Sequence, residues 1–363
     1  MLRPYGPVPR AGAAVVRDRR GMHGGEYTST VYRSRRRGPG GGRWRTWLRW
    51  TLLVLLVLVV VAVCGLAGTY LWADDRLRQT PALADHPGRP APGKGSNWLI
   101  IGSDTRSDLT RKERQELHVG GGGRRNTDTV MVLHHGASGP YLVSIPRDSY
   151  VPIPGHGRGK INSAYARGGP KLLTRTVEDA TGLRLDHYAE IDFLGFTRVV
   201  DALDGVRLCL RRPLRDEKSG ADLRAGCQTL HGRDALAFVR ARYSDPRGDL
   251  GRVERQRMLL RALVHEGTGA SVVSDPWRFY PFLGAALDAV TVDEGTDVLS
   301  LARMAWKVRG LTGGDGGTAT VPVANPGLSV PGAGEVVAWN RARARELFDQ
   351  LRRDVPITAV RVT

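Results

Sequence analysis

The sequence lacks the signatures of several common enzyme classes. It has no Gly-x-Ser-x-Gly elbow, no His-Glu-x-x-His segment, and no P-loop or dinucleotide fingerprint, which argues against serine hydrolases, zinc peptidases and the common nucleotide-binding folds. It contains only three cysteines, and no four Cys or His residues have the spacing of a zinc site. Acidic residues are also few, 36 against 54 basic ones, so the formal net charge is +18.

The positive charge is concentrated at the N-terminus. Residues 1–50 hold twelve arginines against Asp18 and Glu26, a net charge of +10. A basic total usually suggests nucleic-acid binding, but here most of it belongs to one short segment. Residues 1–43 are rich in Gly, Pro and Arg and have no apolar periodicity, which predicts a disordered basic tail.

Charge is absent from the 24 residues between Trp50 and Ala73. A helix of this length spans a hydrocarbon core of about 30 Å, so residues 44–73 are predicted to be a transmembrane helix with its flanks. Tryptophan and tyrosine residues stand at both ends, as in an interfacial aromatic belt. A cleaved signal peptide is the alternative, but the apolar run and the basic segment before it are too long. The arginines before the span predict a cytoplasmic N-terminus and an extracellular domain, hence a single-pass cell-membrane protein.

The cysteines fit this topology. Cys64 lies within the apolar span, where a thiol is a small apolar side chain. Cys209 and Cys227 lie in the part predicted to be extracellular, which is an oxidising environment, and are predicted to form a disulfide. Two free buried thiols remain the alternative.

Residues 74–96 are rich in Pro and Gly and are predicted to be a linker, followed by one folded domain over residues 97–363. Strand-like and helix-like patterns alternate through this domain, which predicts an α/β fold with a mixed central sheet sandwiched by helices. The expected strands are 98–101, 130–133, 141–145, 206–210, 318–323 and 357–362. The expected helices are 172–181, 193–203, 250–264, 300–308 and 339–351.

Three of the expected strands have an aspartate at one end. These are Asp104, Asp128 and Asp148, each with arginines close by in the sequence. Mg²⁺ is bound by one or two carboxylates and completed by water and substrate phosphates, so Asp104 and Asp128 are candidate metal ligands. Aspartate is also common in turns after strands, and that alternative applies to each of the two alone.

Residues 240–256 concentrate five arginines and a glutamine in seventeen positions. Asp249 is a suitable N-cap for a helix on which Arg252 and Gln256 lie one turn apart on the same side, with Arg255 beside them. Guanidinium groups bind phosphate oxygens in pairs, which favours a clamp for a polyanion such as a diphosphate. A solvated basic surface is the alternative.

Together these segments resemble the LytR-CpsA-Psr family, in order across roughly residues 97–265. The shared motifs are Gly102-Ser103-Asp104-x-Arg106, Thr127-Asp128-Thr129, Ser144-Ile145-Pro146-Arg147-Asp148, Lys160-Ile161-Asn162, Asp201-Ala202-Leu203-Asp204-Gly205-Val206, Arg240-x-Arg242 and Gly248-Asp249-x-Gly251-Arg252-x-x-Arg255-Gln256. The resemblance implies a membrane-anchored phosphotransferase that moves a glycopolymer, such as teichoic acid or arabinogalactan, from a polyprenyl-diphosphate carrier onto peptidoglycan.

The resemblance also implies roles for the matching residues. Asp104 and Asp128 would hold Mg²⁺ on the diphosphate, and with Arg147 and Arg252 they form the catalytic set. The substrate-binding set is Arg106, Asp148, Lys160, Arg240, Arg242, Arg255 and Gln256. The apolar residues of 193–200 either line a prenyl tunnel or belong to the core.

Three other functions remain open at this point. A polyprenyl-diphosphate hydrolase would use the same metal site with water as the acceptor. A non-catalytic wall-anchoring module would need no metal. A DNA-binding regulator is disfavoured, because the folded domain is predicted to lie outside the cell and the tail has no helix-turn-helix pattern, so no nucleic-acid partner is expected.

Overall fold

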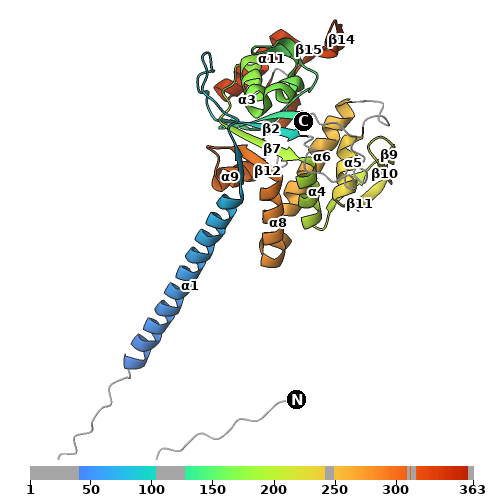
Figure 1. Cartoon of the computed structure of the whole chain (residues 1–363). Helices are drawn as coiled ribbons and strands as arrows, with labels where there is room; N and C mark the ends of the chain where they lie inside the picture. Colours follow the sequence, from blue (N-terminus) through green and yellow to red (C-terminus); the bar gives the residue numbers. More distant parts are fainter. Residues whose placement is uncertain (1–40, 104–126, 242–248, 309–310, 312–315, 359–363) are drawn as a thin grey trace, which may run out of the picture. The chain divides into compact units, whose positions relative to one another are not determined.

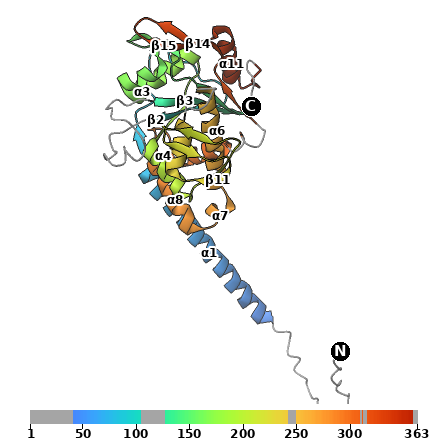
Figure 2. The same ribbon diagram turned by 90° about the vertical axis from the view of Figure 1, so that its right-hand side faces the viewer.

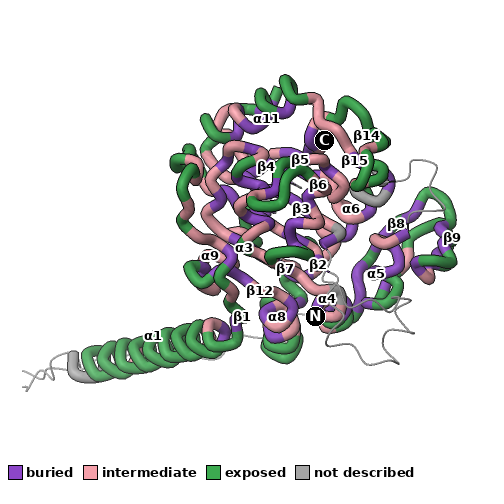
Figure 3. Tube along the Cα trace, turned by 45° about the horizontal axis from the view of Figure 1, so that its top comes forward, coloured by how far each residue is buried: buried purple, intermediate pink, exposed green. Residues whose placement is uncertain are grey.

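The computed structural model describes residues 41–103, 127–241, 249–308, 311 and 316–358, in two units, Met1–Ala62 and Val63–Thr363. The helix α1 (Gly41–Arg76) begins in the first unit and ends in the second. Residues 52–68 of α1 are exposed, as Figure 3 shows in green. Within the described part of the chain, Trp44–Arg76 is the single helical stretch long and apolar enough to cross a membrane.

The second unit is built on a mixed seven-stranded sheet (Figure 1). Its strand order is β1-β12-β7-β2-β3-β4-β13. The pairs β1–β12, β7–β2 and β4–β13 are parallel, and the other pairs are antiparallel. The strands are β1 (Arg78–Thr80), β2 (Ser96–Ser103), β3 (Thr127–Gly136), β4 (Gly139–Ile145), β7 (His187–Asp192), β12 (Val290–Asp293) and β13 (Gly317–Thr320).

Alternate residues of the central strands enter two separate cores, because successive side chains of a strand point to opposite faces. Leu99 and Ile101 pack with α3 (Ile161–Thr181) and α11 (Arg341–Arg353), whereas Trp98 and Met131 pack with helices of the other face. Those helices are α6 (Asp249–Gly267), α8 (Pro276–Ala289) and α9 (Val298–Val308). Figures 1 and 2 show α3 and α11 on one side of the sheet and α6 and α8 on the other. The sandwich predicted from the sequence is therefore confirmed.

A third core lies mainly in a lateral subdomain, residues 193–241, and also includes Leu259 and Val272. The subdomain contains α4 (Phe193–Ala202), α5 (Gly232–Arg240), and the antiparallel pairs β8 (Val206–Leu210)–β11 (Gly226–Leu230) and β9 (Leu214–Asp216)–β10 (Ala221–Leu223). Cys209 and Cys227 face each other across β8 and β11 and form a disulfide, the pair that the sequence predicts. The bond closes a loop of the subdomain and restricts its unfolded state.

The hairpins β5 (Tyr150–Ile153)–β6 (Gly157–Lys160) and β14 (Val323–Val330)–β15 (Gly334–Trp339) complete the unit, with the short α7 (Ala270–Val273). Every expected strand and helix corresponds to an observed one, apart from 357–362. Ile357 and Thr358 form no strand, and the rest of that stretch lies outside the described residues. The expected strand 206–210 exists, but it pairs in the lateral subdomain and not in the main sheet.

The predicted linker, residues 74–96, is wrong as a separate spacer. Arg78–Thr80 forms β1, which pairs with β12 at the edge of the main sheet, and Ala82 is 1% exposed. Arg89 donates to the buried carboxylate of Glu178 over 3.1 Å and to the carbonyl of Leu185 over 2.9 Å. The Pro- and Gly-rich composition conceals a strand whose partner is more than 200 residues away, so residues 77–89 belong to the folded domain.

Asp354 ties the end of α11 to the turn between β3 and β4. Its carboxylate accepts hydrogen bonds from the Ala137 amide (2.6 Å), the Ser138 amide (3.0 Å) and the Ser138 hydroxyl (2.6 Å). Burial opposes ionisation of this group, but the hydrogen bonds from Ser138 and Ala137 together outweigh it, so the pKa of Asp354 is well below its usual range. The folded state therefore favours the ionised carboxylate.

We expect Asp354→Asn to lower the free energy of unfolding at neutral pH by about 2 kcal/mol, because a charged acceptor of several hydrogen bonds is lost. A group with a depressed folded pKa stabilises above its unfolded pKa of about 4 and loses that contribution as pH falls toward the folded value. The difference in the free energy of unfolding between wild type and variant should therefore shrink below about pH 4 in urea titrations.

Asp349→Asn, on the same helix but 39% exposed, is the control and should change stability by less than about 0.5 kcal/mol. An equal loss in both variants, or a difference independent of pH, would contradict this assignment.

Candidate functional site

One edge of the main sheet gathers the ends of four strands. Ser103 at the end of β2 pairs with Thr127 at the start of β3 and with Asp192 at the end of β7. The end of β4, Ile145, pairs with Val130. The backbone therefore brings the positions that precede Asp104 and Arg147 to the same edge as Asp128, which lies in β3 beside a shift in register.

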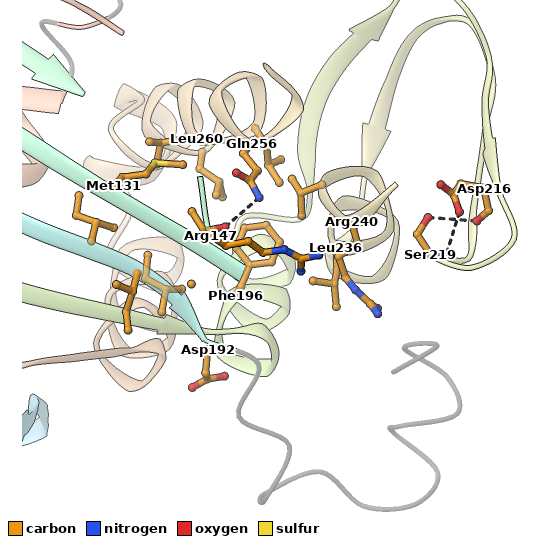
Figure 4. Close-up of a pocket in the computed structure, with 18 of the residues that line it drawn as sticks. Met131, Arg147, Asp192, Phe196, Asp216, Ser219, Leu236, Arg240, Gln256 and Leu260 are labelled. Atoms are coloured by element: carbon orange, nitrogen blue, oxygen red, sulfur yellow. Dashed lines mark hydrogen bonds between the residues drawn. The ribbon is translucent and has the colours of Figure 1, made fainter. Parts of the chain in front are cut away.

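A pocket of about 420 Å³ opens beside this edge, between the sheet, α4, α5 and α6. Most of its wall is apolar, with side chains from all four parts of the fold, so that an apolar ligand bound there would lose its contact with water. The apolar lining is Ile100, Ile101, Met131, Ile191, Phe196, Leu236, Val239, Leu259, Leu260 and Leu263. Figure 4 shows Met131, Leu260 and Phe196 around this part of the pocket.

The remaining lining is polar and includes Arg147, Arg240 and Gln256, three residues that the sequence predicts for the site. In Figure 4 the side chain of Arg147 extends from the end of the sheet toward α5, and that of Arg240 extends from α5 close by. The Gln256 amide donates to the Thr129 hydroxyl over 2.9 Å, which fixes α6 to β3. The polar part of the pocket is thus suited to an anion, because guanidinium groups bind phosphate oxygens.

Asp148 lies between two cations. Its carboxylate oxygens are 3.1 Å from the Lys160 ammonium and 3.5 Å from the Arg147 guanidinium, and all three side chains are between 23% and 31% exposed. Lys160 is the last residue of β6 and directly precedes α3. The Asp148 carboxylate therefore holds the Arg147 and Lys160 side chains beside each other through ion pairs, and the place of Asp148 and Lys160 in the substrate-binding set stays a prediction.

Arg255 is placed differently from the prediction. It is 6% exposed, it does not line the pocket, and its guanidinium donates to the carbonyl of Ala241, which follows α5. On a helix, residues 255 and 256 point about 100° apart, so only one of them can face the pocket. We therefore assign Arg255 to holding α6 against the end of α5, and not to binding substrate.

Several predicted residues cannot be placed in this geometry. Asp104, Arg106 and Arg242 lie outside the described residues. Asp128 and Arg252 belong to β3 and α6, but the structure describes only their backbone. Among the described residues no group of three or more His, Cys, Asp and Glu side chains could hold a metal ion. The side chains of Asp104 and Asp128, the residues predicted to hold Mg²⁺, lie outside the described set.

The structure adds pocket residues that the sequence analysis missed. Asp192 caps α4 by accepting the Gly195 amide over 2.5 Å. The pKa of this carboxyl is raised, because the effect of burial exceeds the opposite effect of that hydrogen bond. An acid between a strand and an apolar helix was a usable signal for Asp192. Asp216 and Lys218, from the turn between β9 and β10, also line the pocket, and nothing in their local sequence indicates it.

The apolar residues of 193–200 contribute to the core of the lateral subdomain. Val200 is fully buried in it, and Phe196 packs against it and also lines the pocket. The prenyl tunnel stays a prediction. The side chain of Phe193 lies outside the described set.

The chain is similar in sequence to a known protein family and to a named relative. The LytR_cpsA_psr family model matches residues 75–350. The probable cell wall biosynthesis protein LcpB of Corynebacterium glutamicum is 44% identical over 287 residues, which cover 78% of this chain and 66% of that relative. The chain therefore spans just under two thirds of the length of this relative.

Solved structures share the fold at lower identity. A LytR-Csp2A-Psr enzyme from Actinomyces oris superposes with a TM-score of 0.58 at 20% identity, covering 79% of this chain and all of that one. TagT bound to LI-WTA superposes with a TM-score of 0.53 at 23% identity, covering 77% of this chain and 97% of that one. The extent of the match to the family model, with the motifs that meet at the sheet edge, establishes that this chain belongs to the LytR-CpsA-Psr family.

Proposed function

We propose that this protein is a membrane-anchored, Mg²⁺-dependent phosphotransferase that moves a glycopolymer from a polyprenyl-diphosphate carrier onto peptidoglycan through a phosphodiester bond. One observation carries the proposal: a single pocket joins a long apolar wall to a polar part that contains Arg147, Arg240 and Gln256. A prenyl diphosphate has this combination of an apolar chain and a concentrated anion. Relatives named for cell wall biosynthesis, and a related fold solved with LI-WTA, support the same substrate class.

The membrane anchor is part of the proposal. The helix over Trp44–Arg76 is long and apolar enough to span a bilayer, and the arginines before it favour a cytoplasmic N-terminus. The catalytic domain would then lie outside the cell, at the outer surface of the membrane where it could meet peptidoglycan.

The reaction needs charge neutralisation more than covalent help. A muramic acid hydroxyl would attack the glycan-side phosphorus, a new P–O bond would form, and polyprenyl phosphate would leave with the electron pair of the broken bond. Arg147 and Arg240 would bind the diphosphate oxygens and stabilise the charge that develops on the leaving group. Asp104 or Asp128 would accept the hydroxyl proton, and Mg²⁺ held by these carboxylates would neutralise the diphosphate.

A polyprenyl-diphosphate hydrolase is the second candidate, because water could replace the hydroxyl at the same pocket. The two activities differ in their products. A transferase yields a phosphodiester on the muropeptide, whereas a hydrolase yields a free sugar phosphate. A wall-anchoring module would form neither product.

We expect Arg147→Ala and Arg240→Ala each to lower kcat/KM by about 100-fold or more, because each removes a cation from the transition state. The assay is transfer of a radiolabelled sugar from its polyprenyl-diphosphate carrier to muropeptide by the full-length protein, with and without a chelator. Arg233→Ala is the control, since Arg233 is an exposed residue of α5 that does not line the pocket. Unchanged rates in both pocket variants, or activity that survives chelation, would refute this mechanism.

Arg255→Ala should behave differently from Arg240→Ala. Removing a buried guanidinium that is bonded to the Ala241 carbonyl should lower the free energy of unfolding by about 2–3 kcal/mol. Arg240→Ala is expected to cost less than about 1 kcal/mol, because it is only half-buried. Urea denaturation of both variants measures this difference. A stable Arg255→Ala protein with impaired transfer would restore Arg255 to the substrate-binding set.

A further inference from the structure

α8 packs along the last turns of α1 in a regular parallel arrangement. The hydrogen-bonded pairs between the two helices have an offset of 211 or 212 positions in the sequence. All of them belong to the second unit, Val63–Thr363. These pairs are Thr69 with Tyr280 and Arg76 with Asp288, and between them Trp72 lies beside Tyr280 and Gly284.

These contacts are specific enough to fix the register. The hydroxyls of Thr69 and Tyr280 are 2.8 Å apart, and the Trp72 and Tyr280 rings meet edge to face with centroids 5.9 Å apart. The Arg76 guanidinium donates two hydrogen bonds of 2.9 Å to the Asp288 carboxylate. In Figure 1, α8 and the end of α1 both run from the lower side of the picture toward the sheet.

The register fixes the position of the N-terminus of α8 along the apolar span of α1. With the same offset, Trp277 lies level with Leu66, seven residues before Ala73, where the uncharged stretch ends. At 1.5 Å per residue this is about 10 Å inside the end of that stretch. The uncharged stretch of α1 is about 36 Å long, so in a hydrocarbon core of about 30 Å centred on it Trp277 would lie about 7 Å below the boundary with the headgroups.

The side chains at this position suit a lipid interface. Trp277 is 89% exposed, the highest value among the large apolar residues that the structure describes, and Val273 close by is 56% exposed. Tryptophan and tyrosine prefer the headgroup region of a bilayer, where the ring is apolar and its polar atom stays hydrated. Arg278 is exposed beside Trp277 and can extend its guanidinium to lipid phosphates. One acid, Asp275, lies close by, and its carboxylate accepts the Trp277 amide over 3.0 Å as the cap of α8.

We propose that residues 270–280, the α7–α8 corner, insert into the interfacial layer of the bilayer that α1 spans. The proposal rests on the membrane anchoring put forward above, because α1 defines the height. Lipid is the occupant that the register selects: at the level of Leu66, any surface beside a membrane-spanning helix meets the outer leaflet. A second protein could cover Trp277 only by displacing lipid there.

The same corner adjoins the pocket through α6. Leu263 lines the pocket, and one turn later Gly267 packs so closely on α8 that a Cβ atom there would be 2.6 Å from the Phe282 ring. Insertion of the corner would therefore hold the apolar part of the pocket close to the bilayer surface. A prenyl chain would then have only a short distance to travel from the lipid to Leu263.

The test uses the full-length protein with Cys64→Ala, so that a single new cysteine carries an environment-sensitive nitrobenzoxadiazole label. Trp277→Cys reports on the corner. Leu328→Cys, at a 37% exposed apolar residue of β14, is the control on the α3 side of the sheet. Both proteins are reconstituted in phosphatidylcholine–phosphatidylglycerol vesicles that contain lipid with a doxyl quencher near the headgroup, and association is checked by flotation.

We expect both proteins to float with the vesicles and the label at 277 to lose about half of its emission, while the label at 328 loses none, because only the former lies in the interface. If both proteins float and neither label is quenched, insertion of the corner is refuted, whereas membrane anchoring by α1 is not. Energy transfer between labels at 277 at high protein density, without quenching by lipid, would show a second copy there and also overturn it. Proteins that fail to float would refute the anchor and, with it, the corner. The transferase assay in detergent would still test the pocket separately.

Discussion

The pairing of β3 between β2 and β4 is the constraint on which the site depends. Because β3 runs antiparallel to both neighbours, and β7 is parallel to β2, the ends of β2, β4 and β7 meet the start of β3 at one edge. Residues that are more than 80 positions apart, from Ser103 to Asp192, therefore become neighbours. A shift by one residue would turn Met131 and Thr129 away from the pocket and into the opposite core.

Local patterns in the sequence were sufficient to predict the sheet sandwich, the apolar helix and the disulfide pair, and to single out Arg147, Arg240 and Gln256, which line the pocket and whose binding roles stay predictions. Each of these follows from periodicity, compartment or short motifs. The rest depends on long-range packing. The pocket exists only because the lateral subdomain packs beside the sheet and adds Phe196 and Leu236. The linker prediction failed because β1 gains its partner from β12, and the Arg255 prediction failed because its direction is set by the Ala241 carbonyl.

The two ends of the proposed substrate make opposite physical demands on one pocket. An isoprenoid chain gains about 25 cal/mol for each Å² of apolar surface that leaves water, whereas a diphosphate must exchange its hydration for fixed cations. In the proposed function, the apolar lining from α4, α5 and α6 would meet the first demand, and Arg147, ion-paired with Asp148, would meet the second. The helix α1 and the α7–α8 corner would place this pocket at the membrane, where such a lipid resides.

The most direct test of the central claim is the identity of the lipid that remains bound to the protein. Mass spectrometry of organic extracts from the full-length protein, purified from bacterial membranes, should detect a polyprenyl phosphate or diphosphate. Extracts of Arg147→Ala should contain much less of it. A wild-type protein that carries no such lipid, and that binds no added prenyl diphosphate in the presence of Mg²⁺, would contradict the account.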